Sequence, residues 1–214
     1  MANYKVVDAD QLDADLTFVA DSIRTKGGTS DQMVFPDGFR SAVENIPDYM
    51  DQWATGILTE FYHPTASVPR ESGFTDQKML RKVELPNAWN SGYYAFCRCS
   101  ALETVIMPKL EKLETASFIS CTSLKRIDFP LLKQINPQGF QNSGVETLII
   151  RKTDGLCTMS NANALGNTPI AKGTGYIYVP RALVDSYKSA TNWSTYASQI
   201  RAIEDYPEVL EGWE

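Results

Sequence analysis

The sequence predicts an α+β protein whose central part is a solenoid of short parallel β-strands with a period of about 22 residues. Three segments align by eye: FTDQKMLRKVELP, FCRCSALETVIMP and FISCTSLKRIDFP. Four phenylalanines follow one another at intervals of 22 residues: Phe74, Phe96, Phe118 and Phe140. A second column keeps this interval, with a last step of 21 residues: Leu80, Leu102, Leu124 and Val145. Several columns that agree at one period indicate a structural repeat.

Each unit contains a short β-strand that ends at a proline. The motifs V-x-L-P, V-x-M-P and I-x-F-P place apolar side chains two residues apart, which is the spacing of one face of a strand. Proline closes the strand because it cannot continue the ladder of hydrogen bonds. Since one unit cannot bury its apolar face alone, we expect stacked units to share one core. The period lies in the range of leucine-rich repeats, so we predict a leucine-rich-repeat solenoid with a parallel β ladder over residues 57–151.

The first units of the solenoid are less regular than the later ones. Leu58 and Phe61 fit the frame of a unit that precedes the aligned segments. In the segment ELPNAWNSGYYAF, Ser91 stands where later units have Leu113 and Ile135. We expect one of three nearby aromatic side chains to fill the space that this serine leaves: Trp89, Tyr93 or Tyr94.

Residues 1–50 are predicted to form a helical hairpin that is a module of its own. One helix is expected over residues 8–28, and a shorter one over residues 36–46. The longer helix has a single apolar stripe and ends at two glycines; the stripe consists of Leu12, Leu16, Val19 and Ile23. The charge supports a separate module, because residues 1–56 contain ten acidic and four basic residues, whereas the rest contains sixteen of each. This hairpin is expected to serve attachment or oligomerisation.

Residues 152–214 are predicted to form an α/β cap on the last coil of the solenoid. The segment YIYVP continues the strand-and-proline frame, and PRALVDSYKSA has the pattern of a helix with proline in its first turn. The segment NWSTYASQIRAI is expected to form a further helix or turn. Its apolar residues suit a cover for the open end of a solenoid: Trp193, Tyr196 and Ile200.

Composition excludes several classes of function. The chain of 214 residues has a net charge of −6, which argues against a nucleic-acid partner. It contains no run of eighteen apolar residues, so no membrane insertion is expected. Its opening residues lack a basic stretch followed by an apolar one, so no signal peptide is expected.

The residues that could carry chemistry have simpler structural explanations. The four cysteines lack the paired spacing of a zinc site, and the repeat explains Cys99 and Cys121 as small buried side chains. A disulfide between those two is geometrically allowed, but we expect free thiols. His63, the only histidine, is expected to be partly buried in the first coil, because no nucleophile shares a recognisable motif with it. We therefore predict no catalytic, metal or cofactor-binding residues; an enzyme would need a site built from the loops of residues 151–175.

The outward residues of the predicted strands form a candidate binding face. Side chains at alternate positions of successive strands should stack into a ladder on one side of the sheet. Solenoids often bind partners on such extended faces, although an ordinary solvated surface is the simpler reading. The predicted face consists of Lys82, Glu84, Thr104, Ile106, Arg126, Asp128, Thr147 and Ile149. Exposed isoleucines on it would support binding.

The repeat resembles the BspA-like leucine-rich repeat family, on units such as FISCTSLKRIDFP. The tail GTGYIYVPRALVDSYKSATNWSTYASQIRAIEDYPE looks like the closing segment of such proteins encoded in prophages of Gram-positive gut bacteria. The opening YKVVDADQLDADLTFVADSIRTKGGTSDQMVFPDGF resembles a segment at the start of many phage tail and baseplate-associated proteins. The chain departs from the repeat pattern at Ser143, in the cysteine position, and at Arg151, in the proline position.

The resemblance implies a non-enzymatic protein of a phage or prophage tail, located in the virion and assembled in the host cytoplasm. Residues 1–50 would contact other tail or baseplate proteins, or join copies of the chain into a homo-oligomer such as a trimer. The solenoid would bind a bacterial surface protein or glycan. The first alternative is a BspA-like adhesin on the bacterial cell surface, which we favour less because no signal peptide is expected from the opening residues. A carbohydrate-active or other enzyme is the least favoured alternative.

Overall fold

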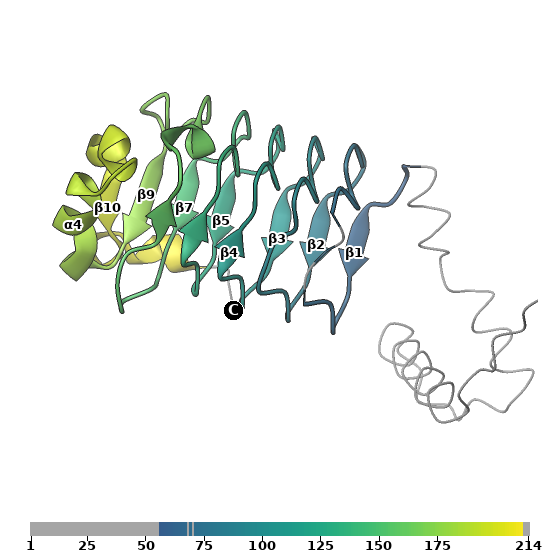
Figure 1. Ribbon diagram of the computed structural model, residues 1–214, viewed down its shortest axis with the longest axis horizontal. Coiled ribbons are helices and arrows are strands. Elements are labelled where there is room, and N and C mark those ends of the chain that lie inside the picture. The colour runs from purple at the N-terminus through teal and green to yellow at the C-terminus, as the bar shows by residue number, and fades with distance from the viewer. Residues whose placement is uncertain (1–55, 68, 70, 212–214) are drawn as a thin grey trace, which may run out of the picture. The chain divides into compact units, whose positions relative to one another are not determined.

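The computed structural model describes residues 56–67, 69 and 71–211 (Figure 1). The helical hairpin expected in residues 1–50 lies outside the described residues. The rest forms a row of stacked coils, as Figure 1 shows, and each coil contributes one β-strand to a main ladder. The predicted parallel leucine-rich-repeat architecture is therefore confirmed for the solenoid.

The strands of the main ladder form two parallel sheets. The first has the order β1-β2-β3 and contains β1 (Glu60–Tyr62), β2 (Lys82–Glu84) and β3 (Thr104–Ile106). The second has the order β10-β9-β7-β5 and contains β5 (Arg126–Asp128), β7 (Thr147–Ile149), β9 (Tyr176–Val179) and β10 (Ile200–Ala202). Strands β2, β3, β5, β7 and β9 were predicted from the sequence. Strand β10 was not, because it lies in the segment expected to form a helix or turn.

A further parallel sheet lies on the opposite side of the coils and was missed by the sequence analysis. It has the order β4-β6-β8 and contains β4 (Lys112–Leu113), β6 (Gln134–Ile135) and β8 (Thr158–Met159). Two residues per strand are too few to show an alternating pattern. In Figure 1 this second sheet lies in front of the main strands. Residues of both layers, such as Val105 and Leu113, are fully buried and belong to the core.

The predicted phenylalanine column is present in the core. The ring centroids of Phe74 and Phe96 are 5.2 Å apart, those of Phe96 and Phe118 are 5.2 Å apart, and those of Phe118 and Phe140 are 5.8 Å apart. All three pairs are stacked. Phe61 extends the column at its first end, 4.6 Å from Phe74. Offset stacking of this kind contributes about 0.5–1.5 kcal/mol per pair beyond the burial of apolar area.

The cysteines are free and buried, as predicted. The Cys99 thiol donates to the Phe74 carbonyl at 2.9 Å, and the Cys121 thiol donates to the Phe96 carbonyl at 3.1 Å. Each cysteine therefore hydrogen-bonds the preceding coil at the same place. Burial raises the pKa of Cys99 to about 12, so the reactive thiolate is scarce at neutral pH.

Ser91 is satisfied by hydrogen bonds rather than covered by an aromatic ring. Its hydroxyl lies 2.6 Å from the Ser117 hydroxyl and accepts from the Glu114 N–H at 2.8 Å. The expectation that an aromatic residue fills this space was wrong. The three candidates are exposed by 47%, 46% and 41%: Trp89, Tyr93 and Tyr94.

The C-terminal segment after β8 consists of short helices that surround β9 and β10. They are η1 (Ala162–Leu165), η2 (Arg181–Leu183), α4 (Val184–Ser189), η3 (Trp193–Gln199), η4 (Ile203–Asp205) and η5 (Pro207–Leu210). The Tyr187 hydroxyl accepts from the Cys157 N–H at 2.7 Å, and the Trp193 indole donates to the Cys157 carbonyl at 2.7 Å. Both rings are buried. Two buried rings of this segment thus bond the backbone of Cys157 on both of its sides, in addition to the pairing of β9 with β7.

Gly144 marks the coil in which the repeat loses one residue. A Cβ atom built on it would lie 2.1 Å from the Thr122 carbonyl oxygen. The backbones of two coils therefore approach each other more closely here than any residue with a side chain permits. Thr122 and Ser100 occupy the same position in the two preceding coils.

We predict that Gly144→Ala destabilises the protein by about 3 kcal/mol, the upper end of the usual cost of overpacking. For a chain of this size, that loss lowers the melting temperature by roughly 6–12 °C. Thermal unfolding followed by circular dichroism measures it. Ser100→Ala, in the equivalent position, is the control and should change the melting temperature little. Equal melting temperatures for the two variants would contradict the close approach.

Candidate functional site

The eight residues of the predicted face lie on β2, β3, β5 and β7 and stack in the predicted register. Lys82 pairs with Thr104, and Glu84 with Ile106. Arg126, Asp128, Thr147 and Ile149 stack in the same way on β5 and β7. Because β3 and β5 belong to different sheets, the face has two halves.

The first half of the face, on β1–β3, is open to solvent. Lys82 and Glu84 form a partly exposed salt bridge of 3.0 Å on one strand. Thr104 and Ile106 are half-buried beside them. Strand β1 adds Tyr62, whose large ring is exposed and stacks in register with Glu84. We name the residues of this half (Tyr62, Lys82, Glu84, Thr104 and Ile106) the open face.

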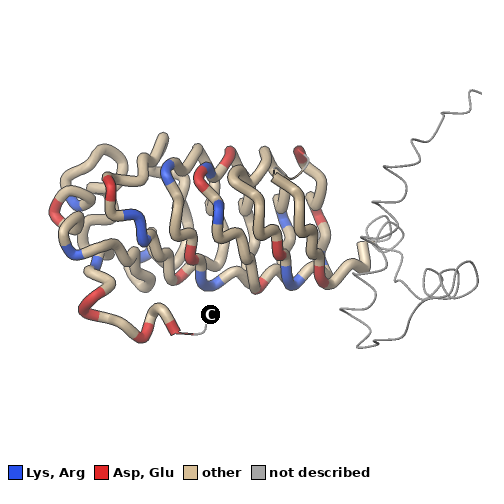
Figure 2. Tube along the Cα trace, turned by 90° about the horizontal axis from the view of Figure 1, so that it is seen from below, with Lys and Arg blue, Asp and Glu red and all other residues tan. Residues whose placement is uncertain are grey.

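The second half, on β5 and β7, is covered, and the expectation of an exposed Ile149 was wrong. Ile149 is 0% exposed and Asp128 only 6%. Figures 1 and 2 show the reason, because the chain after β10 runs back along the solenoid on this side of the main strands. Asp128 also forms a salt bridge with Arg151. Arg151, which replaces the usual proline, therefore has a structural role.

A cluster of aromatic rings holds this returning segment in place. The Tyr206 ring lies 5.6 Å from the Tyr178 ring, edge to face. The Arg201 guanidinium lies 3.2 Å from the centroid of the Tyr176 ring and 4.9 Å from that of Tyr206. Cation–π contacts of this kind contribute about 0.5–2 kcal/mol each. The sequence contained these residues, but their spacing gave no sign that they meet.

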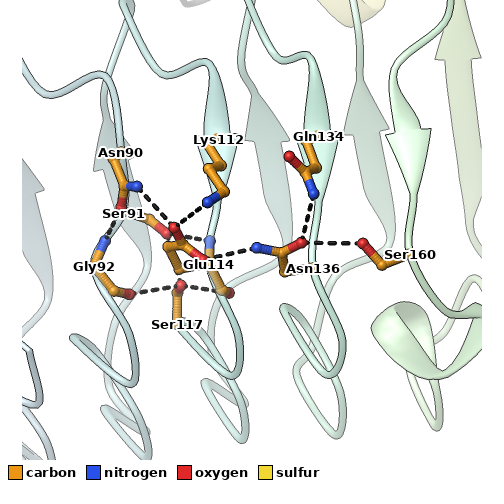
Figure 3. Close-up of polar contacts among 9 residues, drawn as sticks. All are labelled: Asn90, Ser91, Gly92, Lys112, Glu114, Ser117, Gln134, Asn136 and Ser160. Carbon is orange, nitrogen blue, oxygen red and sulfur yellow. Dashed lines mark hydrogen bonds and ion pairs between the residues drawn. The ribbon is translucent and has the colours of Figure 1, made fainter.

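A polar network lies on the other side of the coils, where strands β4 and β6 of the second sheet end (Figure 3). Its centre is the carboxylate of Glu114, which is 2% exposed and lies 2.7 Å from the Lys112 ammonium. Asn90 donates to one carboxylate oxygen at 2.8 Å, and Asn136 donates to the other at 2.7 Å. Asn136 in turn accepts from Gln134 at 2.8 Å and from Ser160 at 3.0 Å.

The electrostatics of the network favour an ionised Glu114. Burial alone would raise the pKa of this carboxyl, but hydrogen bonds from Lys112, Asn90 and Asn136 outweigh it and lower the pKa. The same contact raises the pKa of Lys112. Because the carboxylate is already fully hydrogen-bonded by the protein, it is poorly suited to act as a general base. The network instead joins four successive coils in register.

His63 does not take part in a catalytic arrangement. Its side chain is exposed, so the expectation of partial burial was wrong. Its Nδ1 atom accepts from the Ala66 N–H at 3.0 Å, which closes a turn after β1. In the part of the chain that the structure describes, no group of three His, Cys, Asp or Glu residues is placed to hold a metal ion. Nor does any helix there have the length and apolar character needed to cross a bilayer.

Comparison with known proteins gives the family. The BspA type leucine rich repeat region matches residues 58–164 in six copies. The chain belongs to the BspA-type leucine-rich repeat family. No curated protein matches the sequence. Among solved structures, a leucine-rich repeat protein from Bacteroides ovatus is 18% identical, with a TM-score of 0.49. The match covers 68% of this chain and 42% of that protein.

The buried carboxylate predicts a specific pH dependence of stability. Because the pKa of Glu114 is lowered on folding, its ionisation stabilises the fold above the ordinary value of 4.5, and this contribution is lost as the pH falls below it. We expect Glu114→Gln to cost about 1–3 kcal/mol at neutral pH, since it leaves hydrogen-bond donors unpaired. The difference from the wild type should shrink below pH 4.5.

Urea unfolding at a series of pH values measures this difference. Glu146→Gln is the matched control, since Glu146 forms an exposed salt bridge with Lys125. Its effect should stay near zero. A difference between wild type and Glu114→Gln that does not change with pH would show that the carboxylate charge is not what stabilises the network.

Proposed function

We propose that the chain is a non-enzymatic binding protein of a phage or prophage tail, which presents the solenoid to the surface of a host bacterium. Family membership supports a leucine-rich-repeat scaffold. The resemblance of the opening residues to the start of tail and baseplate proteins supports the tail. In this proposal residues 1–50 attach the chain to the tail or join its copies, and the coils contact the bacterial surface.

The observation that carries the binding role is the difference in solvent exposure between the two halves of the predicted face. The half on β5 and β7 is covered by the protein's own C-terminal segment, whereas no described segment between residues 56 and 211 covers the open face on β1–β3. It combines an exposed aromatic ring, Tyr62, with a charge pair and two β-branched side chains. Aromatic residues are typical of interface centres, and charges of interface rims.

The open face is small, so a single copy would bind weakly. Strands in a parallel ladder lie about 4.8 Å apart, and three of them present only a narrow patch. Several copies held together by residues 1–50 would bind a cell surface through many such patches at once, which raises the overall affinity without a new contact. The partner in this proposal is a bacterial surface protein or glycan.

A BspA-like adhesin displayed on a bacterial cell is the second candidate. Membership of the BspA-type family favours it, and the same open face would serve. The two candidates differ in where the chain resides, in a virion or on a cell envelope.

The location is tested by mass spectrometry of purified particles from an induced strain that carries the gene. We expect the chain in the particle fraction, in a fixed ratio to the tail proteins. Recovery in the cell-envelope fraction of uninduced cells, with none in the particles, would favour the adhesin and contradict the tail proposal.

The open face is tested with the purified chain and whole host cells. We expect the double variant Tyr62→Ala, Lys82→Glu to reduce cell binding about tenfold, the usual effect of removing an aromatic anchor and reversing a contact charge. Lys172→Glu, an exposed lysine in the C-terminal segment, is the control and should bind normally. Unchanged binding by the double variant would exclude the open face.

A further inference from the structure

A groove opens at the C-terminal end of the solenoid, between the last strand and helix α4. Its volume is about 360 Å³. One wall is strand β10, through Ile200, Arg201 and Ala202, and the other is one face of the helical turn that contains Val184 and Lys188. The groove is apart from the open face, which lies on the first three strands.

The strand in this groove is the edge of its sheet. In the order β10-β9-β7-β5, only one side of β10 is paired with a described strand. Ile200 and Ala202 pair with Ile177 and Val179, which point into the core. In this ladder, core-facing residues direct their backbone groups toward the following coil, as the Leu85 N–H does toward the Ile106 carbonyl.

By the same alternation, the Ile200 carbonyl and the Ala202 N–H point away from β9, to the side where a following coil would lie. The described chain has no further coil there. In a parallel sheet, one residue of the next strand donates to the first of these groups and accepts from the second. The edge of β10 therefore has the hydrogen-bonding pattern for one more parallel strand. Edges without a paired strand are where extended peptides add to a sheet.

The side chains around the groove favour an acidic residue in such a strand. Arg181 is paired with Asp205 at 2.5 Å, so these charges compensate each other. Among the residues that line the groove, Lys188 and Arg201 form no salt bridge, and Asp185 is the only carboxylate besides Asp205. A net positive charge thus remains in a protein whose overall charge is −6. The apolar floor, formed with Ile200 and Ala202, is nearly buried.

We propose that the groove binds an extended peptide segment of a partner protein, added in parallel to β10, with an acidic residue between two small apolar residues. The acidic residue lies opposite Arg201, and its side chain points to the same side of the sheet. The two apolar neighbours face the core side of the groove. This binding goes beyond the proposed function, and it does not depend on the open face.

The probe is a fluorescein-labelled peptide of sequence Ser-Val-Glu-Val-Ser, with binding to the full chain followed by fluorescence anisotropy. Ala202→Pro removes the N–H that would bond the peptide. The backbone accepts proline, because the φ angle of Ala202 is −77°. Lys188→Glu replaces the positive charge of the Lys188 ammonium, which forms no salt bridge with the described residues, with a negative charge. We expect each variant to weaken binding about tenfold, as the loss of one hydrogen bond or one charge contact does.

Controls on both partners make the test decisive. Lys172→Glu changes the same charge on an exposed residue outside the groove and should bind the peptide normally. A peptide whose central amide is N-methylated cannot donate to the Ile200 carbonyl, so it should bind about tenfold more weakly to unaltered protein. This peptide tests strand addition even if Ala202→Pro fails to fold.

Two results would overturn the proposal. One is the absence of saturable binding at millimolar peptide concentration by protein whose circular dichroism is native. The other is equal affinity for the N-methylated peptide and its parent, which would show that the groove recognises charge alone. Failure of either kind leaves the test of the open face on cells unaffected, since that test uses residues at the other end of the solenoid.

Discussion

The structure depends on the inability of one coil to bury its own apolar residues. Each regular coil contributes one phenylalanine and only one or two short strands, so its apolar side chains are covered only by the coils before and after it. Burial therefore requires every coil to place Phe96, Phe118 and their equivalents at the same height. A constant period of 22 residues is the simplest way to meet this condition. The stacked rings are its direct result.

Polar residues help to keep successive coils aligned at the position where apolar packing is weakest. Ser91 replaces the apolar residue of the other coils, and there its hydroxyl hydrogen-bonds the Ser117 hydroxyl and the backbone N–H of Glu114, whose carboxylate is the centre of the network. Because a buried carboxylate is costly unless all its lone pairs are satisfied, the network tolerates only one alignment of Asn90 and Asn136. We infer that it contributes more to the uniqueness of the stacking than to net stability.

The sequence was sufficient for the features that repeat and insufficient for those that occur once. Strands β2, β3 and β5, the phenylalanine column and the burial of Cys99 and Cys121 all follow from columns at a fixed period. Strand β4 is only Lys112–Leu113, too short for any pattern, and β10 lies in a segment whose apolar spacing is compatible with a helix or turn. The turns were equally hard to predict, because residues such as Tyr94 and Ala116 adopt positive φ angles usually occupied by glycine or asparagine.

The candidate face was predicted correctly in its stacking and incorrectly in its exposure. Alternation along a strand determines that Asp128 and Ile149 point away from the core. Their burial depends on a segment more than fifty residues later, which Arg201 and the tyrosines hold against the sheet. No local pattern contains that information. The network around Glu114 was missed for a similar reason, since its members come from four different coils.

The shortened coil at Gly144 separates a part of the solenoid with a constant repeat length from a part with irregular intervals. The coils before it share one length, so duplication or loss of a whole 22-residue unit there would change the reach of the protein by about 4.8 Å while leaving both ends as they are. Beyond Gly144 the intervals are irregular: Leu148 and its partner Ile177 are 29 residues apart. Variation in copy number among relatives should therefore be confined to the segment between Phe74 and Gly144, which would act as a spacer of adjustable length.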